Sequence, residues 1–503
     1  MNNNQSFSEF EDEKTMSYFN RVNSDNQKKP PQTCSLVIID RDRMIKTVEL
    51  SGDSVTIGKS ADIIINSGIV SRIHGRFTKV MGEYYYNDEG SLNGSELNGF
   101  KISAGYHVPS NRYLLGNGDA IRVMVPDDPT NPENTLIIFS TKPVSSLKWS
   151  NFDLRSMTVP LQVGRTVPPE HLKIDSMQVS KLHASIYISQ EGVVLKDENS
   201  LNGVFVNGQR ISGYTILKDF DVIGIGGTKL IYLSGYIYYS SRPNGIKLEV
   251  KDISRVVSGG KAILNHVTLT VNPCELVAII GTSGAGKTTF VNCINGYEPA
   301  TSGQVFIDGL DLYRNYKYLK SRIGNVPQKD ELHEYLSVYD FISFTAKLRL
   351  STDISKEERM RRVDTVLDIM GLTEHKTKLI KKLSGGQKKR VSIAMELVAD
   401  PDIFFLDEPT SGLDPETETQ LMHQLKNLSF KIGKTVIVIT HTLQNIHLFD
   451  KIIFLASGGY LCFYGSPAEA LDFFEIKTIP EAYEKVKNNA AFYIDKYQKT
   501  KRG

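Results

Sequence analysis

The sequence predicts a multidomain protein in which two all-β sandwiches precede an α/β domain. First, 503 residues exceed what a single hydrophobic core usually supports. Second, from Ser35 to about Tyr239 short β-branched runs alternate with turns of Gly, Asn, Asp and Ser, a pattern typical of β-sheet proteins. Third, from Leu276 an apolar run enters a glycine-rich turn and then a helical pattern, which indicates an α/β domain.

Composition shifts divide the chain into five segments. We expect a disordered tail at 1–33, β-sandwiches at 34–142 and 143–240, an α/β domain at 241–475 and a helical segment at 476–503. The last segment has helical spacing, which fits either a helix packed on the α/β body or a connection to a membrane domain.

Composition also limits the possible functions. The formal net charge is +2, so no charge excess points to nucleic acid. Four cysteines are scattered without a metal-binding or redox spacing, as expected of a reducing, cytoplasmic compartment: Cys34, Cys274, Cys293 and Cys462. No stretch approaches the ~18 apolar residues of a membrane helix, so we expect any membrane-spanning partner to lie elsewhere.

The β region contains an internal repeat. The segment VSRIHG beginning at Val70 matches VSKLHA at Val179, and DEGSLNG at Asp88 matches DENSLNG at Asp197. Asn98-Gly99 likewise matches Asn207-Gly208. The constant offset of about a hundred residues predicts a duplicated domain, because solenoid repeats have much shorter periods.

A phosphate-binding loop follows the apolar run Leu276–Ile280. Its residues form the pattern G-x-x-x-x-G-K-[ST]: Gly281, Thr282, Ser283, Gly284, Ala285, Gly286, Lys287, Thr288 and Thr289. Glycines let backbone N–H groups surround phosphate oxygens, and the next helix directs its positive end at the same charge. We expect Lys287 to contact the β- and γ-phosphates of ATP and Thr288 to bind Mg²⁺.

A second apolar run, Ile403–Leu406, ends in two acidic residues. Ligands of open α/β sheets bind at the carboxyl ends of the strands. We expect Asp407 to hold Mg²⁺ and Glu408 to orient and deprotonate the attacking water. An acidic helix cap is the alternative for this pair taken alone, and the phosphate-binding loop upstream favours the chemical interpretation.

Between these motifs, the run LSGGQKKR resembles the signature of ABC ATPases, and residues from about Ile246 to Glu475 resemble that family in order and spacing. The signature residues are Ser384, Gly385, Gly386 and Gln387. Gln328 resembles the Q-loop glutamine and a further Mg²⁺ ligand, Asp414 the D-loop aspartate, and His441 the switch histidine. The family's aromatic residue that stacks on adenine has no counterpart in Ser254–Ser258.

The resemblance implies an ATPase that needs a second ATPase domain, as a homodimer or with a related subunit. Two domains would face head to tail, so that Ser384 and Gly386 of one contact the γ-phosphate held by the other. Further stretches, including EPTSGLD at Glu408, resemble the G-type branch of ABC transporters, which implies a membrane permease partner and a place on the cytoplasmic face of the membrane. A soluble ABC ATPase without transport and a phosphopeptide-binding scaffold are the alternatives.

Each β repeat resembles a forkhead-associated (FHA) domain, an eleven-strand sandwich that binds phosphothreonine peptides. The resemblance assigns Arg165 and Ser180 to phosphate and Asn202 to the peptide backbone in the second copy, with His183 bracing the loop. The first copy has Lys59, Ser71 and Asn93 at these places. Because lysine lacks the bidentate geometry of arginine, we expect weaker binding by the first copy.

Overall fold

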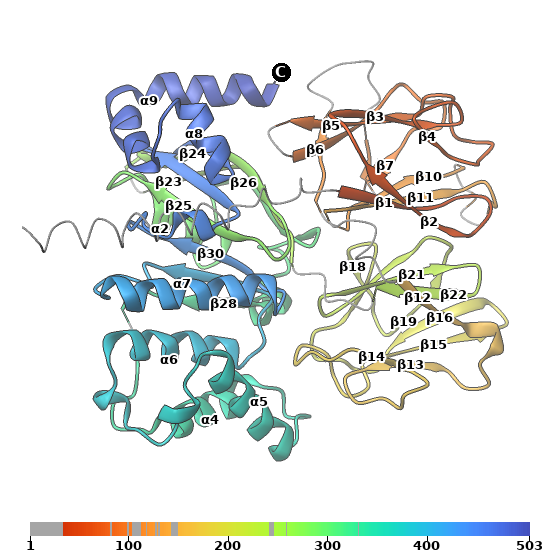
Figure 1. Ribbon diagram of the computed structural model, residues 1–503. Coiled ribbons are helices and arrows are strands. Elements are labelled where there is room, and N and C mark those ends of the chain that lie inside the picture. The colour runs from red at the N-terminus through yellow and green to blue at the C-terminus, as the bar shows by residue number, and fades with distance from the viewer. Residues whose placement is uncertain are drawn as a thin grey trace, which may run out of the picture.

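The computed structural model describes residues 34–80, 83–97, 100–102, 112–116, 118–125, 128, 131–141, 149–240, 246–257, 259–329 and 331–502. The expected disordered tail at 1–33, the matched Asn98-Gly99 pair and residues 241–245, where the α/β domain was expected to begin, lie outside these ranges. Three bodies are visible in Figure 1: repeat 1 (residues 34–141), repeat 2 (residues 149–240) and a C-terminal domain (residues 246–502).

Repeat 1 is a β-sandwich of two sheets. One sheet has the order β2-β1-β11-β10-β7-β8 and the other β4-β3-β5-β6-β9. The strands are β1 (Cys34–Ile39), β2 (Ile45–Leu50), β3 (Ser54–Gly58), β4 (Ile63–Ile64), β5 (Gly75–Val80), β6 (Glu83–Asp88), β7 (Glu96–Leu97), β8 (Phe100–Lys101), β9 (Tyr113–Leu114), β10 (Ala120–Val123) and β11 (Thr135–Ser140).

Repeat 2 is also a β-sandwich of two sheets, but the strand beside β21 is its last strand, β22, where repeat 1 has its first strand, β1, beside β11. Its sheets have the orders β12-β22-β21-β20-β17-β18 and β14-β13-β15-β16-β19. The strands are β12 (Trp149–Asp153), β13 (Leu161–Gly164), β14 (Leu172–Lys173), β15 (Ala184–Ser189), β16 (Gly192–Asp197), β17 (Val204–Val206), β18 (Gln209–Arg210), β19 (Tyr214–Leu217), β20 (Val222–Ile225), β21 (Thr228–Leu233) and β22 (Tyr236–Ser240). The two duplicated sandwiches predicted from the internal repeat are therefore confirmed.

The two repeats also share a hydrophobic cluster. Alternate residues of β1 point into the core of repeat 1, as Leu36 and Ile38 do, whereas Val37 and Ile39 belong to a second cluster. That second cluster includes Phe220 of repeat 2. Every residue of β1 is consequently buried, because both faces of this sheet are covered.

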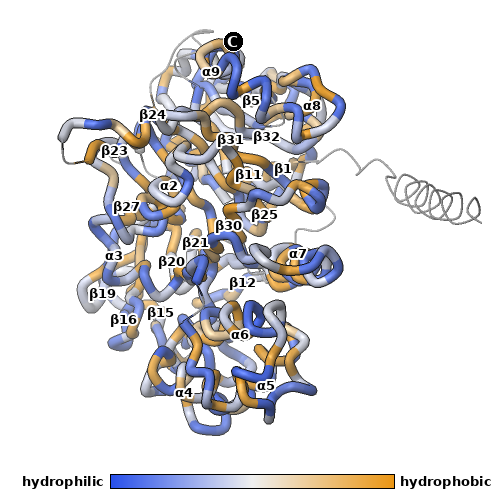
Figure 2. The backbone as a smooth tube through the Cα atoms, turned by 90° about the vertical axis from the view of Figure 1, so that its left-hand side faces the viewer, coloured by the Kyte–Doolittle hydropathy of each residue, from blue (hydrophilic) through white to orange (hydrophobic). Residues whose placement is uncertain are grey.

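The C-terminal domain is built on a ten-stranded sheet with the order β27-β26-β23-β24-β32-β31-β25-β30-β29-β28. Its strands are β23 (Leu248–Val256), β24 (Ala262–Val271), β25 (Leu276–Gly281), β26 (Ser302–Ile307), β27 (Leu310–Asp311), β28 (Ile323–Val326), β29 (Ile403–Asp407), β30 (Thr435–Ile439), β31 (Lys451–Ala456) and β32 (Tyr460–Gly465). Figure 2 shows the hydrophobic stretches in strands that cross the middle of the molecule, such as β30 and β31.

Helices cover this sheet and form a separate helical lobe, which we define as α4, α5 and α6 (Figure 1). The helices are α2 (Lys287–Ile294), α3 (Tyr316–Leu319), α4 (Val338–Arg349), α5 (Lys356–Ile369), α6 (Gly385–Leu397), α7 (Pro415–Phe430), α8 (Pro467–Phe474) and α9 (Ile479–Arg502), with short 3₁₀ turns such as η4 (Lys320–Arg322) between them.

Helix α9 packs on the body of the C-terminal domain. Its residues Ile479, Ala482, Val486 and Tyr497 are buried in the main core of that domain. These contacts fit a helix packed on the α/β body, and a connection from this segment to a membrane domain stays a prediction.

Candidate functional site

Parallel strands bring the predicted catalytic residues to one edge of the large sheet. Strand β29 lies between β28 and β30, with Val326 opposite Leu406 and Asp407 opposite Ile439. Gln328, Glu408 and His441 follow the carboxyl ends of these three strands within two residues. The phosphate-binding loop leaves the end of β25, which pairs in parallel with β30.

Three of the predicted side chains meet at Glu408. One carboxylate oxygen, Oε1, lies 2.7 Å from Nε2 of His441, and the other, Oε2, accepts a hydrogen bond of 2.9 Å from Nε2 of Gln328. The backbone of Glu408 has a φ of 46°, which is the left-handed region and costs a non-glycine residue of the order of 1–3 kcal/mol. Strain of this kind persists where the surroundings fix a side chain in place, and here they fix a carboxylate between an amide and an imidazole.

Next to it, the phosphate-binding loop begins helix α2. Gly286 precedes the helix in the left-handed region with a φ of 81°, and an added Cβ would lie 2.9 Å from the carbonyl oxygen of Ile263. The buried ammonium of Lys287 donates to the carbonyl oxygens of Gly281 and Thr282, at 3.0 and 3.2 Å. Burial lowers the pKa of Lys287, although Glu408 and Asp407 oppose this effect.

The other loop residues surround the same turn. Thr282 lies 3.3 Å from the hydroxyl oxygen of Ser457, Ala285 is buried, and Thr289 is half-buried in the first turn of α2. Ser283 and Gly284 are exposed at the tip of the loop.

Of the three residues predicted to bind Mg²⁺, Thr288 and Asp407 lie close together. The hydroxyl of Thr288 donates to Oδ2 of Asp407 at 3.4 Å, whereas Gln328 donates to Glu408. Burial, and then the charge of Glu408, raise the pKa of Asp407. The hydroxyl of Thr288 and the carboxylate of Asp407 are the oxygen ligands that Mg²⁺ prefers. The positive charge of a bound Mg²⁺ would also stabilise the ionised form of Asp407, which burial and Glu408 disfavour.

The signature residues lie at the start of α6 in the helical lobe. Ser384 caps this helix: its hydroxyl accepts from the N–H of Gln387, while the Gln387 side chain accepts from the N–H of Ser384. Ser384 and Gly385 are exposed, and Gly386 is buried against Thr417 of α7. Among the described residues, no hydrogen bond joins this turn to the phosphate-binding loop.

Asp414 of the predicted D-loop caps helix α7, where its carboxylate accepts from the N–H and the hydroxyl of Thr417. The D-loop side chain is exposed, as is the signature serine. Both therefore face outward from the domain that carries them.

The predicted phosphopeptide loops have the same internal geometry in both repeats. His183 is buried, burial lowers its pKa, and its Nδ1 accepts from the N–H of Ser180 at 3.0 Å. His74 accepts from Ser71 in the same way at 3.1 Å. These histidines brace the loops, as predicted for His183.

The asparagines also correspond between the repeats. Nδ2 of Asn202 donates to the carbonyl of Gln178, and Nδ2 of Asn93 to that of Ile69, both at 2.7 Å. The cations differ in their surroundings. Lys59 is exposed and donates to the carbonyl of Gly68 at 2.6 Å, whereas Arg165 is buried against the C-terminal domain.

Comparisons with known proteins agree with this geometry. The family profile described as ABC transporter matches residues 264–411, and the FHA domain profile matches residues 55–124 and 161–226. The methionine import ATP-binding protein MetN of Corynebacterium diphtheriae is 36% identical over 233 residues, which are 45% of this chain and 68% of that protein. The chain belongs to the ABC transporter family. Its C-terminal domain is an ABC-type ATPase domain, called the ABC domain below, and it follows two FHA domains.

Two longer relatives add detail to the ABC assignment. The ABC transporter ATP-binding/permease protein Rv1747 of Mycobacterium tuberculosis is 37% identical over 315 residues, 61% of this chain and 36% of that protein. ABC transporter G family member 26 of Arabidopsis thaliana is 34% identical over 278 residues, 52% of this chain and 39% of that protein. This similarity agrees with the predicted G-type branch. The chain thus spans less than half the length of these two relatives. Within the described residues, no helix has the length and hydrophobicity needed to cross a membrane.

The sequence did not predict how closely the FHA repeats and the ABC domain are joined. Buried ion pairs connect repeat 1 to the ABC domain: Lys451 lies 3.0 Å from Glu83, and Lys247 lies 2.6 Å from Asp119. Repeat 2 contributes Arg210, whose guanidinium donates to the hydroxyl of Tyr318.

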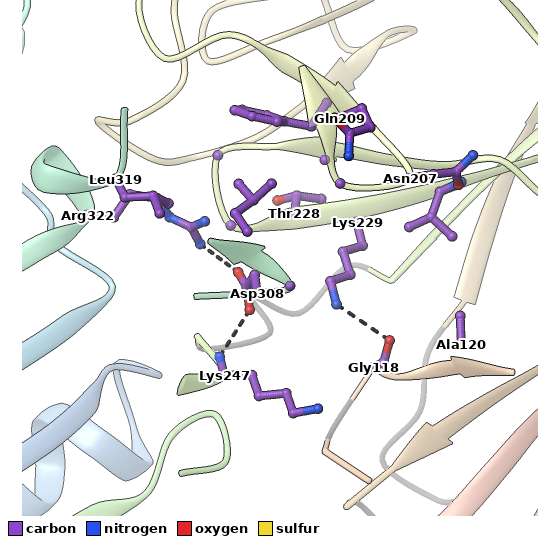
Figure 3. Close-up of a pocket in the computed structure, with 18 of the residues that line it drawn as sticks. Gly118, Ala120, Asn207, Gln209, Thr228, Lys229, Lys247, Asp308, Leu319 and Arg322 are labelled. Atoms are coloured by element: carbon purple, nitrogen blue, oxygen red, sulfur yellow. Dashed lines mark hydrogen bonds and ion pairs between the residues drawn. The ribbon is translucent and has the colours of Figure 1, made fainter. Parts of the chain in front are cut away.

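A cavity of about 120 Å³ lies where all three parts meet. Figure 3 shows Asp308 of the ABC domain between Arg322 and Lys247, and Lys229 of repeat 2 directed toward Gly118 of repeat 1. Two interactions at this junction cross between bodies: the ammonium of Lys247 pairs with Asp119 of repeat 1, and that of Lys229 donates to the carbonyl of Gly118. We therefore treat the two repeats and the ABC domain as one docked unit.

Proposed function

We propose that the chain is the ATP-hydrolysing part of a membrane transporter and that its FHA repeats regulate it by binding phosphothreonine. The observation that carries the ATPase proposal is the meeting of Gln328, Glu408 and His441 beside the phosphate-binding loop. A carboxylate held between an amide and an imidazole at the carboxyl edge of a parallel sheet suits a group that orients water for attack.

In the proposed reaction, Lys287 and the loop N–H groups bind the phosphates of ATP, and the N-terminus of α2 adds its partial positive charge. Glu408 accepts a proton from the attacking water. His441 and Gln328 fix the two oxygens of that carboxylate. Thr288 and Asp407 would hold Mg²⁺, which supplies positive charge to the phosphate oxygens.

The exposed signature turn supports pairing with a second ATPase domain. Ser384, Gly385 and the start of α6 present a hydroxyl, N–H groups and a helix N-terminus outward, all of which suit an anion. We propose that this turn completes the ATP site of a partner domain, as the D-loop residue Asp414 also would. A permease would then be the second partner and would place the chain at the cytoplasmic face of a membrane.

The FHA proposal rests on the loop geometry common to both repeats. Ser180 and Ser71 each present a hydroxyl that accepts from the next loop, from Leu201 and Leu92 respectively, at 3.2 Å. The phosphate ligands would be Arg165 and Ser180 in repeat 2 and Lys59 and Ser71 in repeat 1, with Asn202 and Asn93 beside the peptide.

A mixing experiment tests the pairing of ATPase domains. Ser384→Arg places bulk against the partner's γ-phosphate, and Lys287→Ala weakens phosphate binding, so each variant alone should lose hydrolysis. Mixed together, they form heterodimers with one complete site, built from the loop of the first variant and the signature of the second. We expect part of the activity to return.

The control is a mixture of Lys287→Ala with the double variant Ser384→Arg/Lys287→Ala, which contains no complete site and should stay inactive. Activity that never returns in the first mixture, or that persists in either single variant, contradicts head-to-tail pairing.

A further inference from the structure

The guanidinium of Arg165, which would bind phosphate in repeat 2, already has anionic partners. Its side chain is 3% exposed. Nη2 lies 3.3 Å from Oδ2 of Asp353, Nη1 donates to Oε1 of Glu358, and Nε donates to the carbonyl of Val179 at 3.1 Å. Asp353 and Glu358, which we call the acidic pair, belong to the ABC domain. Asp353 lies just before α5, and Glu358 lies in the first turn of that helix.

Two other loops of repeat 2 face the ABC domain as well. The N–H of Lys181 donates to Oδ2 of Asp353 at 3.0 Å, so one carboxylate oxygen binds both the guanidinium and a backbone amide. The carbonyl oxygen of the Asn202 side chain accepts from the hydroxyl of Ser321 at 3.2 Å. Both the phosphate-binding and the peptide-binding residues of repeat 2 are thus engaged by their own chain.

The acidic pair matches a phosphate group in charge. Two ionised carboxylates carry two negative charges, and a phosphothreonine carries about 1.5 to 2 at neutral pH. Burial opposes ionisation of Asp353, yet its pKa is lowered overall because Ser351, the Lys181 N–H and Arg165 stabilise the anion. The pKa of Glu358 is lowered in the same way, against burial, by the Ser355 N–H and by Arg165. Both side chains therefore approach Arg165 as anions.

Repeat 1 lacks this arrangement. Lys59 is exposed and donates to a carbonyl of its own repeat, and Asn93 does the same. Within the described residues, no hydrogen bond or ion pair joins Lys59, Ser71 or Asn93 to the ABC domain. The engagement by acidic residues is specific to the copy that carries arginine.

We propose that the acidic pair occupies the phosphate-binding site of repeat 2 as an intramolecular ligand, and that a phosphothreonine peptide binds there by displacing it. This inference rests on the proposed phosphopeptide function. A closed site reduces the apparent affinity of a ligand in proportion to the fraction of molecules that are open. Repeat 2 would therefore bind a peptide only when the helical lobe moves away from it.

Displacement would reach the ATPase site through the helical lobe. Glu358 is part of the capping box that begins α5, and its Oε2 accepts from the N–H of Ser355. From the same helix, Arg362 donates to the carbonyl of Leu397 at the end of α6 and to Asp400. Asp400 in turn accepts from the N–H of Met177 in repeat 2. Helix α6 begins with the signature residues, so repeat 2 contacts the segment that directly follows the helix that would complete a partner's ATP site.

The test uses the full chain and the double variant Asp353→Asn/Glu358→Gln. Asparagine keeps an acceptor for the Lys181 N–H, and glutamine keeps the capping box, so the variant removes charge while preserving shape. The probe is a degenerate peptide mixture with one fixed phosphothreonine, and its unphosphorylated counterpart. We expect the double variant to bind the phosphorylated mixture at least about tenfold more tightly than the unaltered chain. Adding Arg165→Ala should remove that gain.

A matched control is Glu357→Gln/Asp364→Asn, which also removes two negative charges, here from positions in helix α5 that, among the described residues, form no ion pair or hydrogen bond with Arg165. It should leave peptide affinity unchanged. Hydrogen exchange supplies an independent readout: residues 176–183 and 351–358 should lose protection in the double variant but not in the control.

The outcomes separate this inference from the proposed function. Equal, Arg165-dependent affinity of the unaltered chain and the double variant would overturn intramolecular occupancy while leaving phosphopeptide binding intact. If no variant binds the phosphorylated mixture, the phosphopeptide function fails and hydrogen exchange decides the occupancy. Loss of protection in the double variant alone then supports it, and unchanged protection overturns it.

Discussion

Phe220→Ala should loosen both FHA repeats, although the residue belongs to repeat 2. Its ring is fully buried in the cluster shared with Val37, Ile39 and Ile138 of repeat 1. The guanidinium of Arg43 in repeat 1 lies 5.0 Å from the ring centroid. Removing a buried phenyl ring costs about 3–5 kcal/mol, and losing the cation–π contact adds about 0.5–1 kcal/mol. The backbone φ of 70° is retained by alanine, so backbone strain does not offset this loss.

Native-state hydrogen exchange of the full chain measures the effect strand by strand. In Phe220→Ala, amides of β1 and β11 in repeat 1 should exchange faster, together with those of β21 and β22 in repeat 2. Leu195→Ala is the control, because Leu195 is fully buried in the core of repeat 2 alone. It should affect β1 and β11 much less. If Phe220→Ala leaves β1 and β11 unchanged, the repeats do not depend on a common core.

Two further predictions concern the ABC domain. Gly386→Ala should destabilise the packing of α6 on α7 by about 1–3 kcal/mol in denaturant titrations, because its Cβ would lie 2.1 Å from Cγ2 of Thr417. Adding Thr417→Ser, which removes that Cγ2, should restore the stability. If it does not, the contact with Thr417 is not the cause of the loss. Binding of Mg²⁺·ATP should weaken as pH falls through the raised pKa of Asp407, which lies above the ordinary value. Glu408→Gln removes the like charge and should move that midpoint to lower pH, as a pH series of binding titrations would show; an unmoved midpoint would exclude this coupling.

The structure brings together several residues that local sequence signals had marked as candidates for an ATPase site. An apolar run that ends in Asp407 and Glu408, another that ends near His441, and a glycine-rich loop after Ile280 each depend on neighbours in the chain. Parallel pairing then brings the strand ends together without further information. Ser384 and Gln387 also have the three-residue spacing of a capping box, which the structure shows at the start of α6.

Docking between the bodies was not predictable in this way. Arg165 and Glu358 are 193 residues apart, and nothing local to either residue indicates the other. The sequence supplied only the residue types, an arginine on a loop and an acidic residue in a helix's first turn. One signal was available for the shared core: the uninterrupted apolar run Leu36–Ile39, which in an antiparallel strand indicates that both faces are covered.

The central claim, that Glu408 is the catalytic base, is tested most directly by ATP turnover. The measurement is the rate of phosphate release with Mg²⁺ and ATP, for the purified chain and for Glu408→Gln. Glutamine keeps the shape and an acceptor for Gln328 but cannot take a proton from water. We predict a fall in turnover of about 10²–10⁴-fold, with ATP still bound and an ATP-dependent dimer accumulating. Glu416→Gln, an exposed change in the first turn of α7, should turn over ATP normally. Unchanged turnover in Glu408→Gln would contradict the assignment of Glu408 as the catalytic base.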